Sequence, residues 1–499
     1  MNFSRIVERW AGHRPQHVAV RFQGEDTTYE ALWRRVEAAT LRLASLGIRQ
    51  GDRVAYLGYN HPELLAILFA CARLGAMLVP LNFRLAAPEH AEILASADPA
   101  VLVVEPDFRA HASAIATSLP LMRLVALRGA PPGWFAWEGP LPVGFEPKLP
   151  GTDADPVLIV YTSGTTGRPK GAVHTQSGLL WNIVNATAYQ DLTSRDHVLT
   201  VLPMFHVGGL CIQTLPALAA GATATIHARF DAGAFLRDVA ALRPTLTLLV
   251  PATLQAVYAH PDWARADLSS LREVNTGSST VPDSLFAPFH ARGIPVGQVY
   301  GATETGPVSI CLRAEDAMRK VGSAGKPAVH TEIRLVDTAE RDVAPGEVGE
   351  ILVRAPNVMQ GYWKDPDNPA FRDGWFHTGD LARVDEEGYY WVVGRTKDMI
   401  ISGGENVYPA ELENVLAGCA EIAEAAVIGV PDAKWGEAVV AVVVRRPGAA
   451  LDAAAVLSRF DGRLARFKHP RRVVFVESLP KSALGKVQKV ELRKLIGAG

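Results

Sequence analysis

The spacing of hydrophobic positions changes several times along the chain, and the first part alternates between two patterns. Residues 28–47 carry apolar side chains at helical spacing and stop at a glycine, which predicts an amphipathic helix. Short apolar runs at residues 53–59 and 76–82 predict buried strands on either side of a second helix. The longest apolar stretch, residues 64–81, is broken by Arg73 and Gly75, so we expect a buried helix running into a strand rather than a membrane span. Strands that alternate with helices of this length predict a largely parallel, helix-covered sheet.

The same alternation returns after a Pro- and Gly-rich stretch at residues 131–156, which we expect to cross the surface between two such units. Residues 320–394 differ, because short strands joined by Gly, Asp and Pro turns predict a small β-barrel or distorted sheet. After Arg395, the pattern predicts a small α+β domain of roughly 100 residues. We therefore expect an N-terminal domain over residues 1–395 and a C-terminal domain over residues 396–499. The strands of the second unit are expected at residues 157–163, 197–203, 223–227, 245–251 and 296–301.

Net charge, cysteine spacing and the N-terminal sequence indicate which partners, thiol state and cellular location to expect. Lys and Arg total 50 against 52 Asp and Glu, a net charge of -2, so the whole chain gives no reason to expect nucleic acid or an anionic membrane. The cysteines Cys71, Cys211, Cys311 and Cys419 have neither zinc nor disulfide spacing, and we expect reduced structural thiols. The N-terminus lacks the charged start and apolar run of a signal peptide, which favours a cytoplasmic protein without a transmembrane segment.

The strongest local signal is a loop rich in glycine and hydroxyl side chains, Tyr161-Thr-Ser-Gly-Thr-Thr-Gly-Arg-Pro-Lys-Gly171. It follows an apolar strand and precedes a helix that we expect to begin near Gln176. Glycines let backbone amides approach phosphate oxygens, and the hydroxyls add donors. The spacing is neither that of a P-loop nor that of a dinucleotide fold. A polar turn is the simple alternative, but four hydroxyls followed by a lysine favour an anion-binding loop.

Three weaker signals follow this loop. In residues 298–306, Thr303 can donate to a phosphate and Glu304 is a hard oxygen ligand suited to Mg²⁺, although a helix cap would explain the pair alone. Asp380 can accept hydrogen bonds from ribose hydroxyls and Arg395 can reinforce that contact, although a turn acid and a surface arginine are equally common. Lys486 follows a glycine near the C-terminus, where a lysine by itself is usually solvated.

Taken together and in this order, these segments resemble the ANL superfamily of adenylate-forming enzymes over roughly residues 29–495. The acyl-CoA synthetase branch is most similar, through GEVGEILVRAPNVMQGYW, DGWFHTGDL, GRTKDMIISGGENVYPAELE and ALGKVQK. Within it, the chain resembles the fatty-acyl and the 4-coumarate- or feruloyl-CoA ligases. The resemblance implies an α/β fold with a large N-terminal domain of two helix-flanked β-sheets plus a small β-barrel, and a small mobile α+β C-terminal lid.

The same resemblance implies the reaction of an AMP-forming acid–CoA ligase. ATP and a carboxylate give an acyl-adenylate and pyrophosphate, and the acyl group then passes to coenzyme A. ATP, Mg²⁺ and coenzyme A are therefore the expected cofactor and co-substrates, small molecules are the expected partners, and a homodimer is left open.

Roles for individual residues of the ATP site follow from the resemblance. Lys486 resembles the catalytic lysine that bridges the carboxylate and the α-phosphate, where it would stabilise developing negative charge. Thr303 resembles the α-phosphate contact, Glu304 and Thr165 the Mg²⁺ contacts, and Asp380 and Arg395 the ribose contacts. The phosphate loop would comprise Thr162, Ser163, Gly164, Thr165, Thr166, Gly167 and Lys170, and the adenine side Gly277, Ser278, Ser279, Gln298, Val299, Tyr300 and Gly301.

The resemblance also places the hinge, the coenzyme A site and the acyl pocket. The hinge would be Lys397, and rotation there would bring Gly403, Gly404 and Glu405 to a pantetheine tunnel. His206 resembles the gate between that tunnel and the acyl pocket. Coenzyme A would meet Trp435, Phe467, His469 and Arg471, and the acyl pocket would comprise His206, Val207, Gly208, Gly209, Gly301 and Ala302. Two departures stand out: related aryl-CoA ligases often have arginine in place of His469, and the adenine loop reads TGSST rather than the common GGAP type.

The acyl segment, residues 207–213, offers almost no charge, which favours an aromatic (hydroxycinnamate-like) or medium- to long-chain fatty acid. A dicarboxylate would need a buried cation there. We expect Gly208, Gly209 and Gly301 to leave room for an acid larger than acetate. A stand-alone adenylation enzyme that loads a carrier protein is the main alternative, and a luciferase-type oxygenase ranks below it. A degenerate nucleotide-binding scaffold is disfavoured, because its charged catalytic groups would have been lost.

Overall fold

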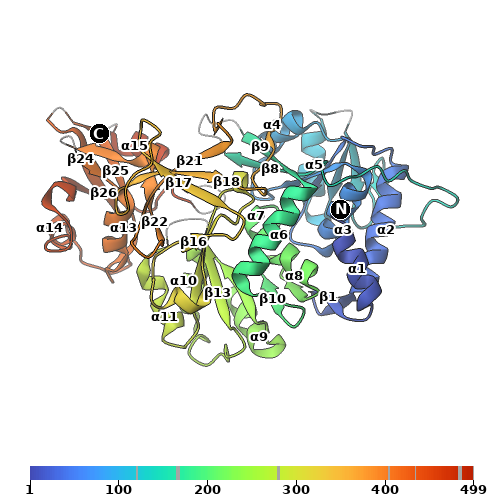
Figure 1. Cartoon of the computed structure of the whole chain (residues 1–499), viewed down its shortest axis with the longest axis horizontal. Coiled ribbons are helices and arrows are strands. Elements are labelled where there is room, and N and C mark those ends of the chain that lie inside the picture. The colour runs from blue at the N-terminus through green and yellow to red at the C-terminus, as the bar shows by residue number, and fades with distance from the viewer. Residues whose placement is uncertain are drawn as a thin grey trace.

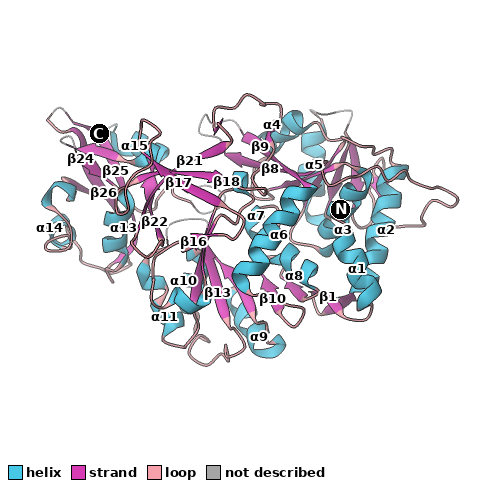
Figure 2. Cartoon of the chain, in the orientation of Figure 1, coloured by secondary structure: helices cyan, strands magenta, loops and turns pink. Residues whose placement is uncertain are grey.

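Four β-sheets and the helices packed on them make up the chain, as Figures 1 and 2 show. The computed structural model describes residues 1–117, 119, 122–163, 169–277, 281–402, 405–432, 434–481 and 486–497, without the side chains of Ser163 and Gly497. The α/β fold class predicted from the sequence is confirmed. The division into domains at residues 395 and 396 stays a prediction.

The largest sheet has nine strands and carries the second strand–helix unit of the chain. Its six central strands, β14 to β1, run parallel, and their apolar runs are almost wholly buried, as a sheet covered on both faces requires. In spatial order the strands are β16 (Lys326–Pro327), β15 (Ile310–Leu312), β14 (Val296–Tyr300), β13 (Glu273–Gly277), β12 (Leu246–Leu249), β10 (His197–Thr200), β11 (Thr223–Ile226), β1 (Val18–Phe22) and β2 (Glu25–Thr28).

The second sheet has eight strands and includes the strand expected before the Gly- and Thr-rich loop. The order is β19 (Gly361–Tyr362), β9 (Pro169–Thr175), β8 (Pro156–Ser163), β4 (Met77–Leu81), β3 (Arg53–Leu57), β5 (Val101–Val104), β6 (Arg123–Ala126) and β7 (Phe135–Ala136). Strand β9 was not predicted; it pairs antiparallel with β8, so the two strands on either side of the loop form a hairpin. The expected helix at its end is confirmed, because α6 (Gln176–Gln190) begins directly after β9.

Helices flank the two large sheets and bury a shared apolar core. One buried cluster unites α2, α3, α6 and α8 with strands of both sheets, which holds the sheets together. The expected helix and strand in residues 64–81 are confirmed as α3 and β4. The helices are α1 (Arg5–His13), α2 (Tyr29–Ser45), α3 (Pro62–Leu74), α4 (Ala87–Ala97), α5 (Arg109–Ala116), α6, α7 (Val207–Gly209), α8 (Leu215–Ala220), α9 (Ala232–Leu242), α10 (Pro251–Tyr258), α11 (Ala287–His290) and α12 (Ala314–Ala317). Shorter helical turns are η1 (Pro106–Phe108), η2 (Leu210–Thr214), η3 (Asp283–Leu285) and η4 (Thr303–Thr305).

A small antiparallel sheet follows, as the change of pattern after residue 320 predicted. Its strands are β17 (Glu332–Val336), β18 (Gly349–Arg354), β21 (Trp375–Val384), β20 (Phe371–Arg372) and β22 (Tyr390–Arg395). In Figure 1 this sheet lies between the large sheets and the C-terminal part of the chain. It therefore connects the two regions in which the candidate catalytic residues lie.

The C-terminal part forms its own sheet with three helices packed against it. The strands are β24 (Glu405–Val407), β23 (Ile400–Ser402), β26 (Gly436–Arg445), β25 (Ile422–Asp432) and β27 (Arg472–Phe475), and the helices are α13 (Pro409–Ala417), α14 (Ala453–Ser458) and α15 (Lys489–Gly497). The turn η5 (Thr396–Asp398) leads into it and η6 (Arg466–Lys468) precedes β27. We call residues after η5 the C-terminal domain.

Two predictions about the whole chain can be compared with the structure. The four cysteines are buried and unpaired, as expected of structural thiols. Within the described ranges, no helix is both long enough and apolar enough to cross a membrane.

Candidate active site

Strand ends from three sheets converge on one region, to which the C-terminal segment also reaches. β14 ends at Tyr300, and η4 follows with Thr303 and Glu304 and contacts β9 of the second sheet. β21 and β22 bring Asp380 and Arg395 together, because the two residues are paired across these antiparallel strands. The open ends of parallel strands are the usual place for a ligand in such sheets. The structure thus brings together residues that lie far apart in the sequence.

Tyr300, Asp380 and Arg395 form a hydrogen-bonded set. The Tyr300 hydroxyl donates to Asp380 Oδ2 at 2.9 Å, and Arg395 Nε lies 2.8 Å from Asp380 Oδ1. The negative charge of Asp380 raises the pKa of Arg395 above its ordinary value. Nearby, the backbone N–H of Gly379 donates to Glu350 Oε1 at 2.9 Å, which fixes the chain next to Asp380. The set presents a fixed carboxylate and a cation, as a ribose phosphate would need.

Glu304 lies where the two large sheets meet. The Tyr362 hydroxyl donates to Glu304 Oε1 at 2.9 Å, and Thr162 Oγ1 approaches the same oxygen at 3.5 Å, a long contact. Burial, followed by the negative charge of Glu304, raises the pKa of Tyr362. Lys170 lies over the Tyr362 ring, with Nζ 5.1 Å from the ring centre and 3.5 Å from Asp365 Oδ2. The phosphate-loop strands therefore meet the candidate metal ligand.

Tyr362 is a functional candidate that the sequence did not single out. The letters GYW helped to establish the resemblance, but nothing local distinguished this tyrosine from a packed aromatic residue. Its position depends on the antiparallel pairing of β19 with β9. Only the fold could place its hydroxyl beside Glu304.

Lys486 stands among the charged groups of this region although it belongs to the C-terminal domain. Burial lowers the pKa of its ammonium group, and the positive charge of Arg395 adds to this effect. The negative charges of Asp380 and Glu304 oppose it, so all three groups act on the lysine electrostatically. The residue nevertheless remains accessible to solvent. A cation in this position could reduce the repulsion between two bound anions.

His206 caps the short helix α7 and lies within electrostatic reach of Lys486. Its Nδ1 accepts the backbone N–H of Gly208 at 3.0 Å. Burial, followed by the positive charge of Lys486, lowers the pKa of the imidazole to about 4, so it is neutral near pH 7. A neutral side chain in this position is compatible with a gate, and that role stays a prediction.

The expectation that glycines enlarge the acyl pocket is wrong at two positions. A Cβ on Gly209 would lie 2.3 Å from the Pro203 carbonyl oxygen, and one on Gly301 would lie 1.6 Å from that of Pro307. These glycines are required by close approach of the backbone and do not open space toward a ligand. Val207 is buried and Ala302 is partly buried beside them. Pocket size must therefore come from other residues.

On the adenine side, the structure describes part of the predicted set. Gln298 is buried, and its Nε2 donates to the Ser323 carbonyl at 2.8 Å. Gly277 approaches the Val299 carbonyl so closely that a Cβ would lie 2.3 Å from its oxygen. The adenine contacts stay a prediction. Outside the described residues lie Gly164, Thr165, Thr166, Gly167, Ser278, Ser279, Gly403 and Gly404, and the side chain of Ser163.

The predicted coenzyme A residues differ in accessibility. The Arg471 guanidinium stacks 4.4 Å above the Trp435 ring, and Phe467 is exposed. His469 is buried, and its Nε2 is hydrogen-bonded to the Leu464 carbonyl at 3.0 Å. Glu405, also predicted for the coenzyme A site, is exposed. The hinge candidate Lys397 is exposed as well. The partly exposed Trp435 ring with its stacked guanidinium could bind a nucleotide, whereas His469 would first have to leave its partner.

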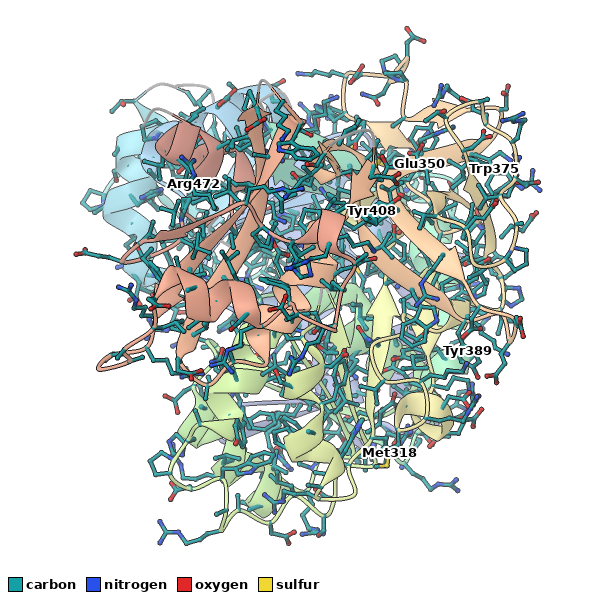
Figure 3. All side chains as sticks on the ribbon, turned by 90° about the vertical axis from the view of Figure 1, so that its left-hand side faces the viewer. Met318, Glu350, Trp375, Tyr389, Tyr408 and Arg472 are labelled. Carbon is teal, nitrogen blue, oxygen red and sulfur yellow. The ribbon has the colours of Figure 1, made fainter. Side chains whose placement is uncertain are left out.

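Figure 3 views the molecule from the side of the C-terminal domain. Arg472, on β27, lies out on that domain, whereas Tyr408 lies toward the antiparallel sheet that carries Glu350 and Trp375. Helix α13, which follows Tyr408, contacts β22. The C-terminal domain thus packs against the sheet that provides Asp380 and Arg395.

Comparisons with known proteins agree with this geometry. The model of the AMP-binding enzyme family matches residues 7–363, and that of the AMP-binding enzyme C-terminal domain matches residues 411–486. The indoleacetate–CoA ligase of Aromatoleum aromaticum is 50% identical, covering 99% of this chain and 98% of the relative. A feruloyl-CoA synthase of an Amycolatopsis species is 45% identical, covering 98% of each chain.

A solved structure extends the likeness to three dimensions. The anthranilate CoA ligase AuaEII in complex with anthranoyl-AMP superposes with a TM-score of 0.91 at 28% identity, covering 99% of this chain and 97% of that one. Family models over most of the chain, together with these full-length relatives, decide the class of protein. The chain belongs to the AMP-binding enzyme family of the ANL superfamily and is an AMP-forming acid–CoA ligase.

Proposed function

We propose that this ligase activates an aryl acid whose ring stands one or two carbons from the carboxylate, with indole-3-acetate and ferulate as the first acids to test. The acids named for the two relatives above share this plan. The acyl segment has no charged side chain between Val207 and Gln213, which suits an uncharged ring. Phe205, next to His206, packs edge-to-face on Phe83 at 5.4 Å, and Tyr59 and Phe108 continue the aromatic cluster.

The observation that carries the chemistry is the position of Lys486 among Glu304, Asp380 and Arg395. In the first step a carboxylate oxygen of the acid attacks the α-phosphorus of ATP, the bond to the β-phosphate breaks, and pyrophosphate leaves. Lys486 reduces repulsion between the two anions and stabilises charge on the α-phosphoryl oxygens. Asp380 and Arg395 orient the ribose. In the second step the coenzyme A sulfur attacks the acyl carbon and AMP leaves.

The donor set around Glu304 fits Mg²⁺. Among the described residues, no group of three or more His, Cys, Asp or Glu side chains could hold a metal ion by itself. Mg²⁺ is commonly held by one or two carboxylates together with substrate phosphates and water, and Glu304 supplies one such carboxylate. When bound there, Mg²⁺ would neutralise phosphate charge and orient the phosphates. Tyr362, hydrogen-bonded to Glu304, would hold that carboxylate in place.

The test compares wild type with Lys486→Ala on a panel of arylacetates, cinnamates, benzoates and C4–C16 fatty acids. Pyrophosphate release is followed with ATP and Mg²⁺, with and without coenzyme A. We expect release that rises with coenzyme A for indole-3-acetate or ferulate, and falls about 100- to 1000-fold in Lys486→Ala. Lys494→Ala is the matched control, because Lys494 is an exposed lysine of the same segment whose one ion pair within the described residues is with Glu491 at 2.8 Å.

Other outcomes have definite meanings. Preference for fatty acids would overturn the aryl proposal while leaving the ligase. Release that ignores coenzyme A but responds to a carrier protein would favour the carrier-loading alternative. Equal loss in both lysine variants would remove Lys486 from the catalytic role.

A further inference from the structure

A cavity of about 250 Å³ is lined by residues of α2, α3 and the segment that follows β6. In Figure 1, α2 and α3 lie at the end of the molecule opposite the C-terminal domain, so the cavity is separate from the region around Lys486. Most of its lining residues have ionisable side chains. The lining comprises Arg35, Ala38, Arg42, His61, Glu63, Leu127, Arg128, Trp137 and Glu138. Nothing in the ligase chemistry uses these side chains.

Positive charge predominates in this cavity. Arg42 donates to the Gly139 carbonyl at 3.1 Å and stacks over the Trp137 ring at 5.9 Å. Arg35 and Arg128, in contrast, form no side-chain hydrogen bond or ion pair with any residue that the structure describes. Two guanidinium groups therefore line the cavity with N–H donors that bind no described residue of the protein. Guanidinium groups present several N–H donors in a plane that matches a carboxylate or phosphate.

The acidic residues of the lining do not cancel this charge. Glu63 accepts the Trp137 indole N–H at 2.7 Å, and burial raises the pKa of Glu63, which disfavours its anionic form. His61 is neutral near pH 7, because burial and the nearby charges of Arg128 and Arg35 lower its pKa to about 4. Glu63 and Glu138 together supply at most two negative charges against the positive charges of three arginines.

The lining also has an apolar side. Trp137 is buried with 3% of its surface exposed, and Leu127 is likewise buried beside it. Both belong to a core cluster that continues into α2 and α3, so this wall is held rigidly. A dry cavity of roughly 150 Å³ can hold benzene, so the volume here is sufficient for a ring with a charged substituent.

We propose that this cavity is a second binding site, which takes a small organic anion with its carboxylate or phosphate on Arg35 and Arg128 and its flat apolar body against Trp137 and Leu127. The site lies outside the adenylate-forming region, so its occupation does not depend on which acid is activated. Its ligand is an effector or a carried metabolite, and not the reacting acid.

Isothermal titration with benzoate and with phenyl phosphate tests this proposal on the full-length protein. We compare wild type, the double variant Arg35→Ala/Arg128→Ala and the control Arg34→Ala. Arg34 neighbours Arg35 on α2 but is exposed and paired with Glu30 at 2.5 Å. Titration with ATP in all three proteins establishes that the adenylate site and the fold are intact.

We expect one probe or both to bind to wild type and to Arg34→Ala, and to bind about tenfold more weakly or not at all to the double variant. Binding of benzoate alone would identify a carboxylate site, and binding of phenyl phosphate alone a phosphate site. The single variant Arg128→Gln, at an exposed position, repeats the test if the double variant binds ATP poorly. Equal binding to all variants, or no binding to wild type, would overturn the proposal.

Discussion

Single contacts in the active region show how the chain prepares charge for a ligand. Asp380 uses both carboxylate oxygens within the protein, one toward Tyr300 and one toward Arg395. A ribose bound as proposed would therefore use the remaining lone pairs of a carboxylate that is already fixed in orientation. Glu304 is held similarly by Tyr362. Fixed carboxylates lose little entropy when a ligand binds, which is how preorganised sites gain affinity.

Tyr362→Phe tests this preorganisation at the residue scale. The change removes the hydroxyl that donates to Glu304 Oε1 at 2.9 Å and keeps the ring under Lys170. A hydrogen bond to a charged group contributes about 1.5–3 kcal/mol, so we expect kcat/KM for ATP to fall roughly tenfold or more. The Mg²⁺ concentration for half-maximal rate should rise in parallel. Tyr258→Phe, at an exposed ring on α10, is the control. An unchanged Mg²⁺ dependence would show that Tyr362 only packs.

At the scale of elements, parallel strands place most of the site and also bury an unusual acid. Glu273, on β13, is 1% exposed, and its Oε1 has no hydrogen-bond partner within the described part of the chain. The neighbouring strand accommodates it through Gly297, where a Cβ would lie 2.3 Å from Glu273 Oε1. Burial raises the pKa of Glu273 from 4.5 to about 8. The folded protein therefore retains a proton that the unfolded chain releases.

Glu273→Gln should change how stability depends on pH. Between about pH 4.5 and 8 the folded wild type binds more protons here than the unfolded chain, so its stability falls as pH rises. The slope from this group is at most about 1.4 kcal/mol per pH unit. A neutral glutamine removes it, so the melting temperature of the variant relative to wild type should rise steadily from pH 5 to pH 8. Glu92→Gln, at an exposed position on α4, should give no such trend. A difference that stays constant with pH would contradict an ionisable origin.

The same elements show what the sequence could and could not predict. Apolar runs predicted β8, β10, β11, β12 and β14, because buried parallel strands need continuous hydrophobic side chains. Strand β9 was missed, since it begins Pro169-Lys-Gly and only its pairing with β8 makes it a strand. The motifs predicted which residues would gather near Lys486. They could not predict Tyr362, or that Gly209 and Gly301 meet backbone carbonyls, because both facts depend on contacts between distant segments.

At the scale of the whole molecule, we predict that the position of the C-terminal domain decides which half-reaction the site can perform. Lys486 belongs to that domain but is influenced by Glu304, Asp380 and Arg395 of the other part, so under the proposed function this is the orientation that adenylation would use. One polar contact between the parts supports it: the Asp283 backbone N–H donates to Asn414 Oδ1, and Asn414 Nδ2 donates to Asp283 Oδ2, both at 3.2 Å. Asn414 lies on α13 and Asp283 on η3.

Asn414→Ala should therefore slow adenylate formation and spare the thioester step. Both hydrogen bonds are exposed, so we expect a loss of roughly threefold to tenfold in the first half-reaction. Stopped-flow pyrophosphate release measures that step, and thioester formation from preformed acyl-adenylate measures the second. The second step should keep its wild-type rate, because a lid that has rotated away from η3 no longer uses the contact. Ser458→Ala, on the exposed side of α14, should leave both rates unchanged. If Asn414→Ala slows both steps equally, the contact supports the fold of the C-terminal domain and does not select its orientation.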